Sequence, residues 1–181
     1  MNLMATTAQY EEVRYRFMDF IRDLTSGINL ALLGAAIAAV VAGIGSALAV
    51  SRVGESVAGL MSEKPELFGK ALVLQAIPGT QGLYGFIVAF LIVLKLGFIG
   101  GDVPDLSFAQ GMYFVFASLP VGIGGYYSAI RQARVAAAGV TLLAKQPEAS
   151  GKSITSAGLV ELYAIFGLIV SLLLVLFAPI A

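Results

Sequence analysis

Hydrophobic and polar positions divide this chain into four long apolar stretches separated by short polar connectors. Three of them carry no charged residue and run over residues 24–51, 71–94 and 106–130. The fourth, residues 153–181, is interrupted by a single carboxylate, Glu161. Each stretch exceeds the roughly 20 apolar residues that a helix needs to cross a bilayer, whereas a membrane β-strand alternates over about 10 residues. The pattern predicts an all-α membrane protein with four transmembrane helices.

The composition supports a membrane location and excludes several kinds of chemistry. Hydrophobic residues make up 59% of the 181 residues and charged residues only 12%, whereas soluble domains usually contain about 25% charged residues. Eleven basic residues balance eleven acidic ones, so the charge does not point to a nucleic-acid partner. The sequence contains neither Cys nor His, which excludes thiolate and imidazole chemistry. A bound metal ion would therefore need oxygen ligands.

The two halves of the chain repeat one another. Segments of the first half recur 79 or 82 residues later with their glycine, proline and charged positions kept, namely Gly43-Ile44-Gly45, Arg52, Pro65-Glu66 and Gly69-Lys70. The copies are separated by an even number of spans, so both run in the same direction, unlike the halves of inverted-repeat transporters. We predict two tandem transmembrane hairpins, at 27–94 and 106–181, as in a subunit that assembles into a ring.

Basic residues are distributed unevenly between the two sides of the membrane. The two connectors that contain Pro65-Glu66 and Pro147-Glu148 carry seven Lys and Arg residues, and the opposite side carries four. The positive-inside rule therefore predicts a multi-pass protein of the cell membrane with both Pro-Glu loops in the cytoplasm and both termini outside.

Residues 1–26 differ in character from the rest of the chain. They contain too many acidic residues for a normal signal peptide. Apolar side chains recur in this segment at helical spacing, with charges between them: Tyr10, Val13, Phe17, Phe20, Ile21 and Leu24. This pattern is typical of an amphipathic helix in the membrane interface, and the alternative is a partly ordered tail.

Glu161 is the first candidate for a functional group. A charged residue at the centre of a bilayer costs about 2.5–3.5 kcal/mol even on lenient insertion scales, so such residues are usually functional. In an antiparallel hairpin, residues equally far from the turn lie at the same depth, which places Gln132 level with Glu161. This argument extends the third helix beyond residue 130 and carries Arg131 and Arg134 into the membrane zone.

The repeat locates further polar groups in the second span. There Gly79 aligns with Glu161, and Thr80, Gln81 and Tyr84 follow it directly. The first hairpin therefore offers hydroxyls and an amide where the second keeps a carboxylate. The alternative interpretation is that these polar side chains only join helices by hydrogen bonds.

Pro78 is expected to kink the second span, because proline lacks an N–H and clashes with the carbonyl four residues back. A carboxylate, two amide oxygens, a hydroxyl and a loosened carbonyl would form the oxygen-only cage that hard cations use. One monovalent ion would neutralise Glu161. A proton would need only the carboxylate and Tyr84, so the additional oxygens favour Na+ over a proton.

Three sequence segments carry a resemblance to a known family. They are LQAIPGTQGLYGF at 74–86, QARVAAAG at 132–139 and VELYA at 160–164. The first closely resembles the second helix of the membrane rotor proteolipid (K-ring or c-type proteolipid) of bacterial sodium-transporting V-type ATPases, and the other two resemble its second hairpin. The likeness covers the chain from about residue 28 to the C-terminus and implies nothing for the N-terminal segment.

The resemblance implies both a site and an assembly. The implied Na+ ligands are the side chains of Glu161, Thr80, Gln81 and Gln132 and the backbone carbonyl of Ile77, with the Tyr84 hydroxyl holding Glu161 in place. The implied assembly is a homo-oligomeric ring in membrane lipid, turned by ATP hydrolysis in other subunits. A membrane stator subunit with an essential Arg and central-stalk subunits at the cytoplasmic loops are the implied partners, and this chain itself would hold no catalytic site.

Three other functions fit parts of the pattern. The first is the same rotor with H+ as the coupling ion. The second is a small oligomeric cation efflux transporter, which also uses one membrane Glu but is disfavoured by the parallel repeat. The third is a purely structural four-span protein, for which replacement of Glu161 would leave transport intact.

Overall fold

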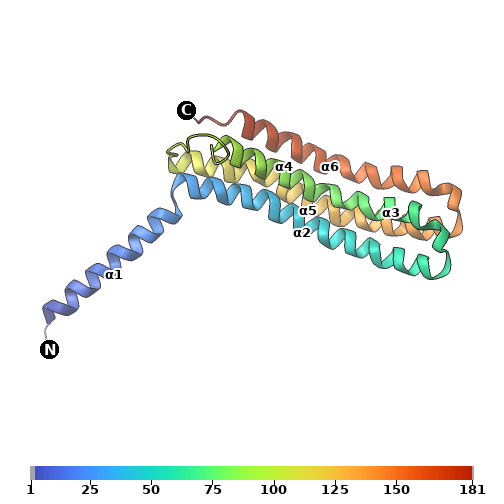
Figure 1. The fold of residues 1–181 in the computed structure, drawn as a ribbon, viewed down its shortest axis with the longest axis horizontal. Coiled ribbons are helices and arrows are strands. Elements are labelled where there is room, and N and C mark those ends of the chain that lie inside the picture. Colours follow the sequence, from blue (N-terminus) through green and yellow to red (C-terminus); the bar gives the residue numbers. More distant parts are fainter. Residues whose placement is uncertain (1–2, 181) are drawn as a thin grey trace.

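The computed structural model describes the backbone of residues 3–180 and the side chains of residues 14–180. Figure 1 shows a bundle of long parallel rods from which the first helix projects. The helices are α1 (Leu3–Leu24), α2 (Gly27–Glu63), α3 (Phe68–Ala76), α4 (Thr80–Lys95), α5 (Phe108–Lys145) and α6 (Ser150–Leu176), with 3₁₀ turns at Pro65–Leu67, Ile77–Gly79 and Pro147–Ala149.

Four of the rods are long and apolar enough to cross a membrane. They are Gly27–Glu63, Pro65–Lys95, Phe108–Lys145 and Pro147–Leu176. The prediction of an all-α protein with four spanning helices in two tandem hairpins is thus confirmed, and the residues that the structure describes include no strand. Extensive contact between α2 and α5 forms the centre of the bundle, while α4 packs on α2 and α6 packs on α5.

The inner helices are longer than the uncharged stretches of the sequence. Helix α5 has 38 residues, which corresponds to a length of about 57 Å against about 30 Å for the hydrocarbon core of a bilayer. The end of the uncharged stretch at Ile130 is therefore not a helix end. Arg131 and Arg134 lie on the continuing helix with their side chains exposed in the single chain, as the depth argument for Gln132 required.

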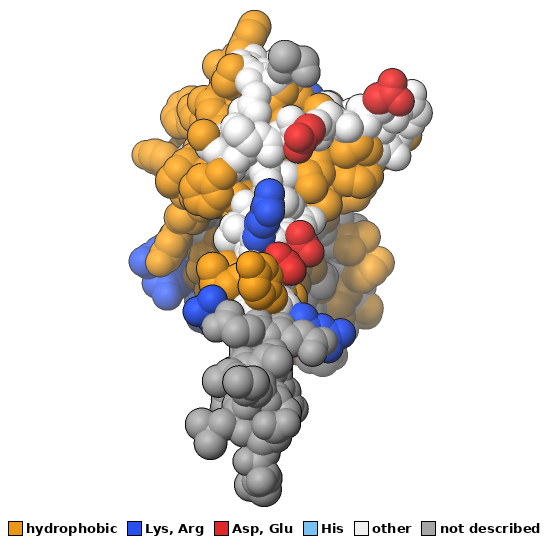
Figure 2. All heavy atoms as spheres, turned by 90° about the vertical axis from the view of Figure 1, so that its left-hand side faces the viewer, with side chains coloured by type: hydrophobic (Ala, Val, Ile, Leu, Met, Phe, Trp, Pro, Cys, Tyr) orange, Lys and Arg blue, Asp and Glu red, His pale blue; other side chains and the backbone are white. Residues whose placement is uncertain are grey.

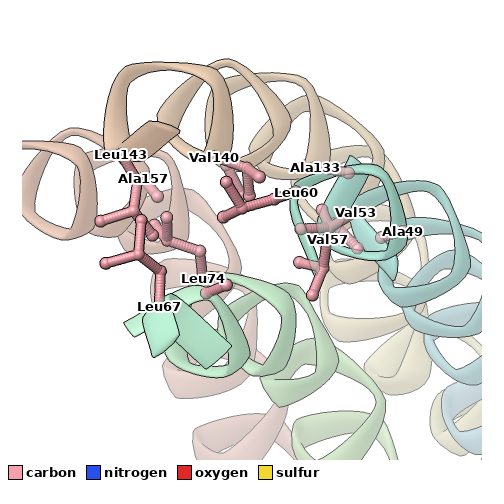
Figure 3. Packing of buried hydrophobic residues seen from close by; sticks show 13 residues of the cluster. Ala49, Val53, Val57, Leu60, Leu67, Leu74, Ala133, Val140, Leu143 and Ala157 are labelled. Atoms are coloured by element: carbon pink, nitrogen blue, oxygen red, sulfur yellow. The ribbon is translucent and has the colours of Figure 1, made fainter. Parts of the chain in front are cut away.

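Small and aliphatic side chains fill the interior between the helices. Figure 3 shows one such cluster, in which α2, α3, α5 and α6 all contribute; its labelled members include Val53, Val57, Leu74, Val140 and Ala157. In lipid, helices associate through close packing and interhelical hydrogen bonds, since the surroundings are as apolar as the core. The many Ala residues of this core let the helix backbones approach closely.

Gly85 is one position where this close approach excludes any side chain. A Cβ atom there would lie 2.2 Å from the carbonyl oxygen of Ala38 on α2. Gly85→Ala is therefore expected to force α4 away from α2 and to lower the free energy of unfolding by about 1–3 kcal/mol. Denaturation of the detergent-solubilised protein by heat or SDS measures this loss.

Gly59→Ala is the matched control, because a Cβ atom at Gly59 meets nothing within 4 Å. The control should unfold at the midpoint of the unsubstituted protein. Equal destabilisation by both substitutions would contradict the packing explanation and would point to helix propensity or to contacts outside the single chain.

Lysine side chains tie the two hairpins together at the helix ends. Lys64 donates to the Ala144 carbonyl at 2.5 Å, and Lys95 donates to the Leu176 carbonyl at 2.6 Å. The last carbonyls of a helix have no partner within the helix, and cations are favourable there. Figure 2 looks at the end of the bundle that carries both the C-terminus and the connector between α4 and α5: charged side chains stand on this end, and hydrophobic side chains cover its flanks.

Candidate ion-binding site

Two hydroxyl groups of α4 meet the carboxylate of Glu161 on α6. The Thr80 hydroxyl donates to Glu161 Oε1 at 2.7 Å, and the Tyr84 hydroxyl donates to the same oxygen at 2.5 Å. Thr80 and Tyr84 are four residues apart, so they share one face of α4. All three side chains are partly buried. Neither donor carries a positive charge, so the carboxylate still needs a cation or a proton to be neutral within a membrane.

The proline kink is formed by a 3₁₀ turn over Ile77–Gly79, with buried Pro78 as its second residue. The backbone N–H of Thr80 bonds to the Ile77 carbonyl, and the Thr80 hydroxyl lies 3.0 Å from the same carbonyl oxygen. The predicted kink is present, but the Ile77 carbonyl accepts hydrogen bonds here rather than standing free. A hydroxyl has one proton, so Thr80 can donate either to Ile77 or to Glu161 at a given moment.

Ser46 of α2 fixes the start of α4 just after the kink. Its hydroxyl oxygen accepts the backbone N–H of Gly82 at 2.7 Å, an N–H that would bond to residue 78 in a regular α-helix. The repeat partner of Ser46 is Ser128, which donates to the Val160 carbonyl next to Glu161 at 3.0 Å. The sequence analysis did not single out these serines. Their spacing of 82 residues within otherwise apolar spans was the available signal.

A buried pair of amides lies beside the carboxylate group. Gln81 Nε2 donates to Gln132 Oε1 at 2.7 Å, and Gln132 Nε2 donates to the Ala157 carbonyl at 3.0 Å. Both glutamines are completely buried. The remaining amide oxygen, Gln81 Oε1, is the one buried side-chain polar atom without a hydrogen-bond partner in the described part of the chain. An unsatisfied buried acceptor costs about 1–3 kcal/mol, and a cation would satisfy it.

Gln132 lies about one helical turn from the depth that the sequence argument gave it. It bonds to Ala157, which is four residues before Glu161, and no hydrogen bond joins either glutamine to Glu161 among the described residues. The structure thus brings together two sub-groups, Thr80 and Tyr84 with Glu161, and Gln81 with Gln132. Thr80 and Gln81 are neighbours in sequence, so the kink holds the two sub-groups side by side. The ligand role of these residues stays a prediction.

The donor set fits a monovalent cation. It offers one carboxylate together with hydroxyl, amide and carbonyl oxygens, all of them hard ligands. Within the part of the chain that the structure describes, no three acidic, His or Cys side chains come close enough to hold a metal ion together. A divalent ion would therefore keep an uncompensated positive charge, whereas one monovalent ion balances Glu161.

Comparison with known families identifies this two-hairpin arrangement. The profile of the family formed by the C subunit of ATP synthase matches residues 33–92 and matches again at 115–174. The chain belongs to the ATP synthase C-subunit family. The two matched segments lie 82 residues apart, which confirms the tandem repeat, and each covers most of one hairpin. Glu161 lies in the second matched segment, and Gly79 lies at the corresponding position of the first.

Several curated members of the C-subunit family are similar to this chain over most of its length. The K subunit of the V-type sodium ATPase of Enterococcus hirae is 48% identical over 159 residues, which cover 88% of this chain and 98% of that protein. The K subunit of the A-type ATP synthase of Methanocaldococcus jannaschii is 39% identical over 145 residues, 80% of this chain and 61% of that protein. The V-type proton ATPase 16 kDa proteolipid of Chrysotila carterae is 30% identical over 142 residues, 78% and 87% of the two chains. The resemblance to a rotor proteolipid is confirmed.

Proposed function

We propose that this protein is the proteolipid subunit of the membrane rotor ring of a V-type ATPase and that it carries Na+ on Glu161. The observation that favours Na+ over H+ is the buried, unpartnered oxygen of Gln81. A proton on Glu161 would neutralise the carboxylate and leave this oxygen unsatisfied. A sodium ion would neutralise the carboxylate and satisfy the amide oxygen together. The 48% identity to a V-type sodium ATPase subunit supports the same conclusion.

The proposed site uses the oxygens that the sequence predicted. Glu161 and Thr80 would bind the ion together with the amide oxygens of Gln81 and Gln132 and the Ile77 carbonyl. In the described structure Gln132 Oε1 and the Ile77 carbonyl accept hydrogen bonds, so ion binding would have to displace or share these donors. Tyr84 needs no rearrangement, because it already donates to Glu161.

Transport follows from the charge of the site. With Na+ bound, Glu161 is neutral and can face lipid at low cost. Without Na+ it is an anion that is costly in hydrocarbon, so it has to meet a positive partner, which we propose to be an Arg of a membrane stator subunit. Rotation of a ring of identical subunits, driven by ATP hydrolysis in other subunits, would then carry one ion per subunit. No step of ATP hydrolysis is assigned to this chain.

The proposed orientation places the Pro-Glu loops in the cytoplasm and both termini outside. Its support is the excess of basic residues in the connectors of the loop side, as the positive-inside rule describes. Both loops lie at the same end of the bundle, where the Lys70 side chain of the first donates to the Pro147 carbonyl of the second at 2.9 Å. We propose that this paired loop surface docks the central stalk.

Carbodiimide labelling tests the proposed function, because these reagents attack protonated carboxyl groups. Labelling of Glu161 in the purified ring is expected to slow as Na+ is raised at constant pH and constant ionic strength, while K+ at the same concentration should leave the rate unchanged. Labelling that depends on pH but not on Na+ would contradict the sodium proposal and select a proton-carrying rotor.

The native mass of the detergent-purified oligomer tests the rotor role separately. A closed ring of many copies is expected. A dimer would contradict the rotor and would favour the cation efflux transporter instead.

A further inference from the structure

Helix α1 lies outside the part of the chain that the family profile matches. It covers Leu3–Leu24, whereas the first matched segment begins at residue 33. Figure 1 shows α1 leaving the bundle beside the start of α2 and pointing away from α6. The described side chains of α1, residues 14–24, are all exposed in the single chain. The predicted helix is therefore present, while the side chains of Tyr10 and Val13 lie outside the described residues.

The exposed side chains of α1 separate into two faces. At 100° per residue, Phe17, Phe20, Ile21 and Leu24 fall on one side of the helix, and three of them are more than half exposed: Phe17 (60%), Phe20 (57%) and Leu24 (51%). The opposite side carries charges of both signs, from Arg16, Asp19, Arg22 and Asp23. A helix with one aromatic and aliphatic face and one charged face is typical of segments that lie in the plane of a membrane surface.

The junction between α1 and α2 restricts where α1 can lie. Asn29 of α2 donates through its side chain to the Asp23 carbonyl at 2.6 Å, and its backbone N–H bonds to the Ser26 hydroxyl at 3.4 Å. The Thr25 hydroxyl donates to the Ile21 carbonyl at 2.8 Å and caps the end of α1. Only Thr25 and Ser26 separate the two helices. Since α2 enters the apolar region at Gly27, the last turn of α1 must lie at the membrane boundary.

We propose that α1 is a membrane-surface anchor whose Phe17, Phe20 and Leu24 face inserts between lipid headgroups on the side where α2 begins. The lipid surface is favoured over a second copy of the chain, because the apolar face of α1 continues directly into the apolar surface of the spanning bundle. The charged face then remains in water, where charges of both signs suit zwitterionic headgroups. This inference does not depend on which ion the ring carries.

The absence of Trp from the sequence provides a direct test. Phe20→Trp places a single fluorophore on the apolar face, and Tyr15→Trp places one on the charged side, where Tyr15 is 67% exposed. Both variants are made in the full chain and reconstituted as the assembled protein into phosphatidylcholine vesicles. Brominated acyl chains are expected to quench the Phe20→Trp emission at least about twofold more strongly than the Tyr15→Trp emission, with a blue-shifted maximum only for Phe20→Trp.

Two results would overturn the proposal. Equal, water-like emission from both variants would mean that α1 stays in solution. Blue-shifted Phe20→Trp emission without quenching by bromolipid would mean that a second copy or another protein covers the apolar face. Phe17→Trp serves as a second apolar-face variant, so that poor folding of one variant leaves the test decisive.

Discussion

Glu161→Gln is expected to abolish ion translocation while the ring still assembles. Gln has nearly the same volume, and its amide oxygen can still accept the hydroxyls of Thr80 and Tyr84, which lie at 2.7 and 2.5 Å in the unsubstituted protein. The packing of α6 against α4 should therefore survive. The negative charge that balances Na+ is lost, and removal of one partner from a buried ion pair costs about 3–5 kcal/mol. The affinity for Na+ should fall by roughly two to three orders of magnitude.

Uptake of radioactive sodium into vesicles that contain the complete ATPase measures this effect, and native mass confirms assembly. Glu148→Gln is the matched control, because Glu148 is an exposed carboxylate of the second loop, and this variant should transport normally. Transport that survives Glu161→Gln would contradict the carrier role and would leave a structural four-span protein as the better explanation.

Thr80→Val is expected to weaken Na+ binding about tenfold to a hundredfold. Val keeps the shape of Thr but removes the hydroxyl that lies 2.7 Å from Glu161 and 3.0 Å from the Ile77 carbonyl. Loss of a hydrogen bond to a charged group costs about 1.5–3 kcal/mol, and a ligand oxygen for the ion is lost with it. The measurement is the Na+ concentration that halves the rate of carbodiimide labelling of Glu161, and this concentration should rise.

Thr155→Val controls for the loss of a helical threonine hydroxyl. Thr155 lies on α6 before Glu161, and its exposed hydroxyl donates only to the Gly151 carbonyl of its own helix, at 3.0 Å. The half-protecting Na+ concentration should be unchanged in this variant. A similar rise in both variants, or none in Thr80→Val, would place Thr80 outside the ion site.

The span pattern and the position of Glu161 could be predicted because they depend on length and charge alone. A bilayer requires long uncharged stretches, and a lone carboxylate within one of them stands out without any knowledge of packing. The internal repeat then located Thr80 and Tyr84, because matched hairpins place matched residues at similar depth.

The depth of Gln132 and the role of Ser46 could not be predicted in the same way. The depth argument assumed the same rise per residue on both sides of the turn, whereas Pro147–Ala149 is a 3₁₀ turn, which rises faster than an α-helix. Ala157 rather than Glu161 therefore lies next to Gln132. The Ser46 contact depends on the way a kinked α4 turns one N–H toward α2, and this follows from tertiary packing rather than from any local pattern.

The glycine at position 79, where the second hairpin has Glu161, bears on the energetics of the whole machine. If the proposed function is correct, each pair of hairpins moves a single ion, so a ring of given circumference passes half as many ions per revolution as one with a carboxylate in every hairpin. A revolution is powered by a fixed quantity of nucleotide free energy. Division among fewer ions leaves more free energy for each one, and the rotor can work against a correspondingly steeper sodium gradient.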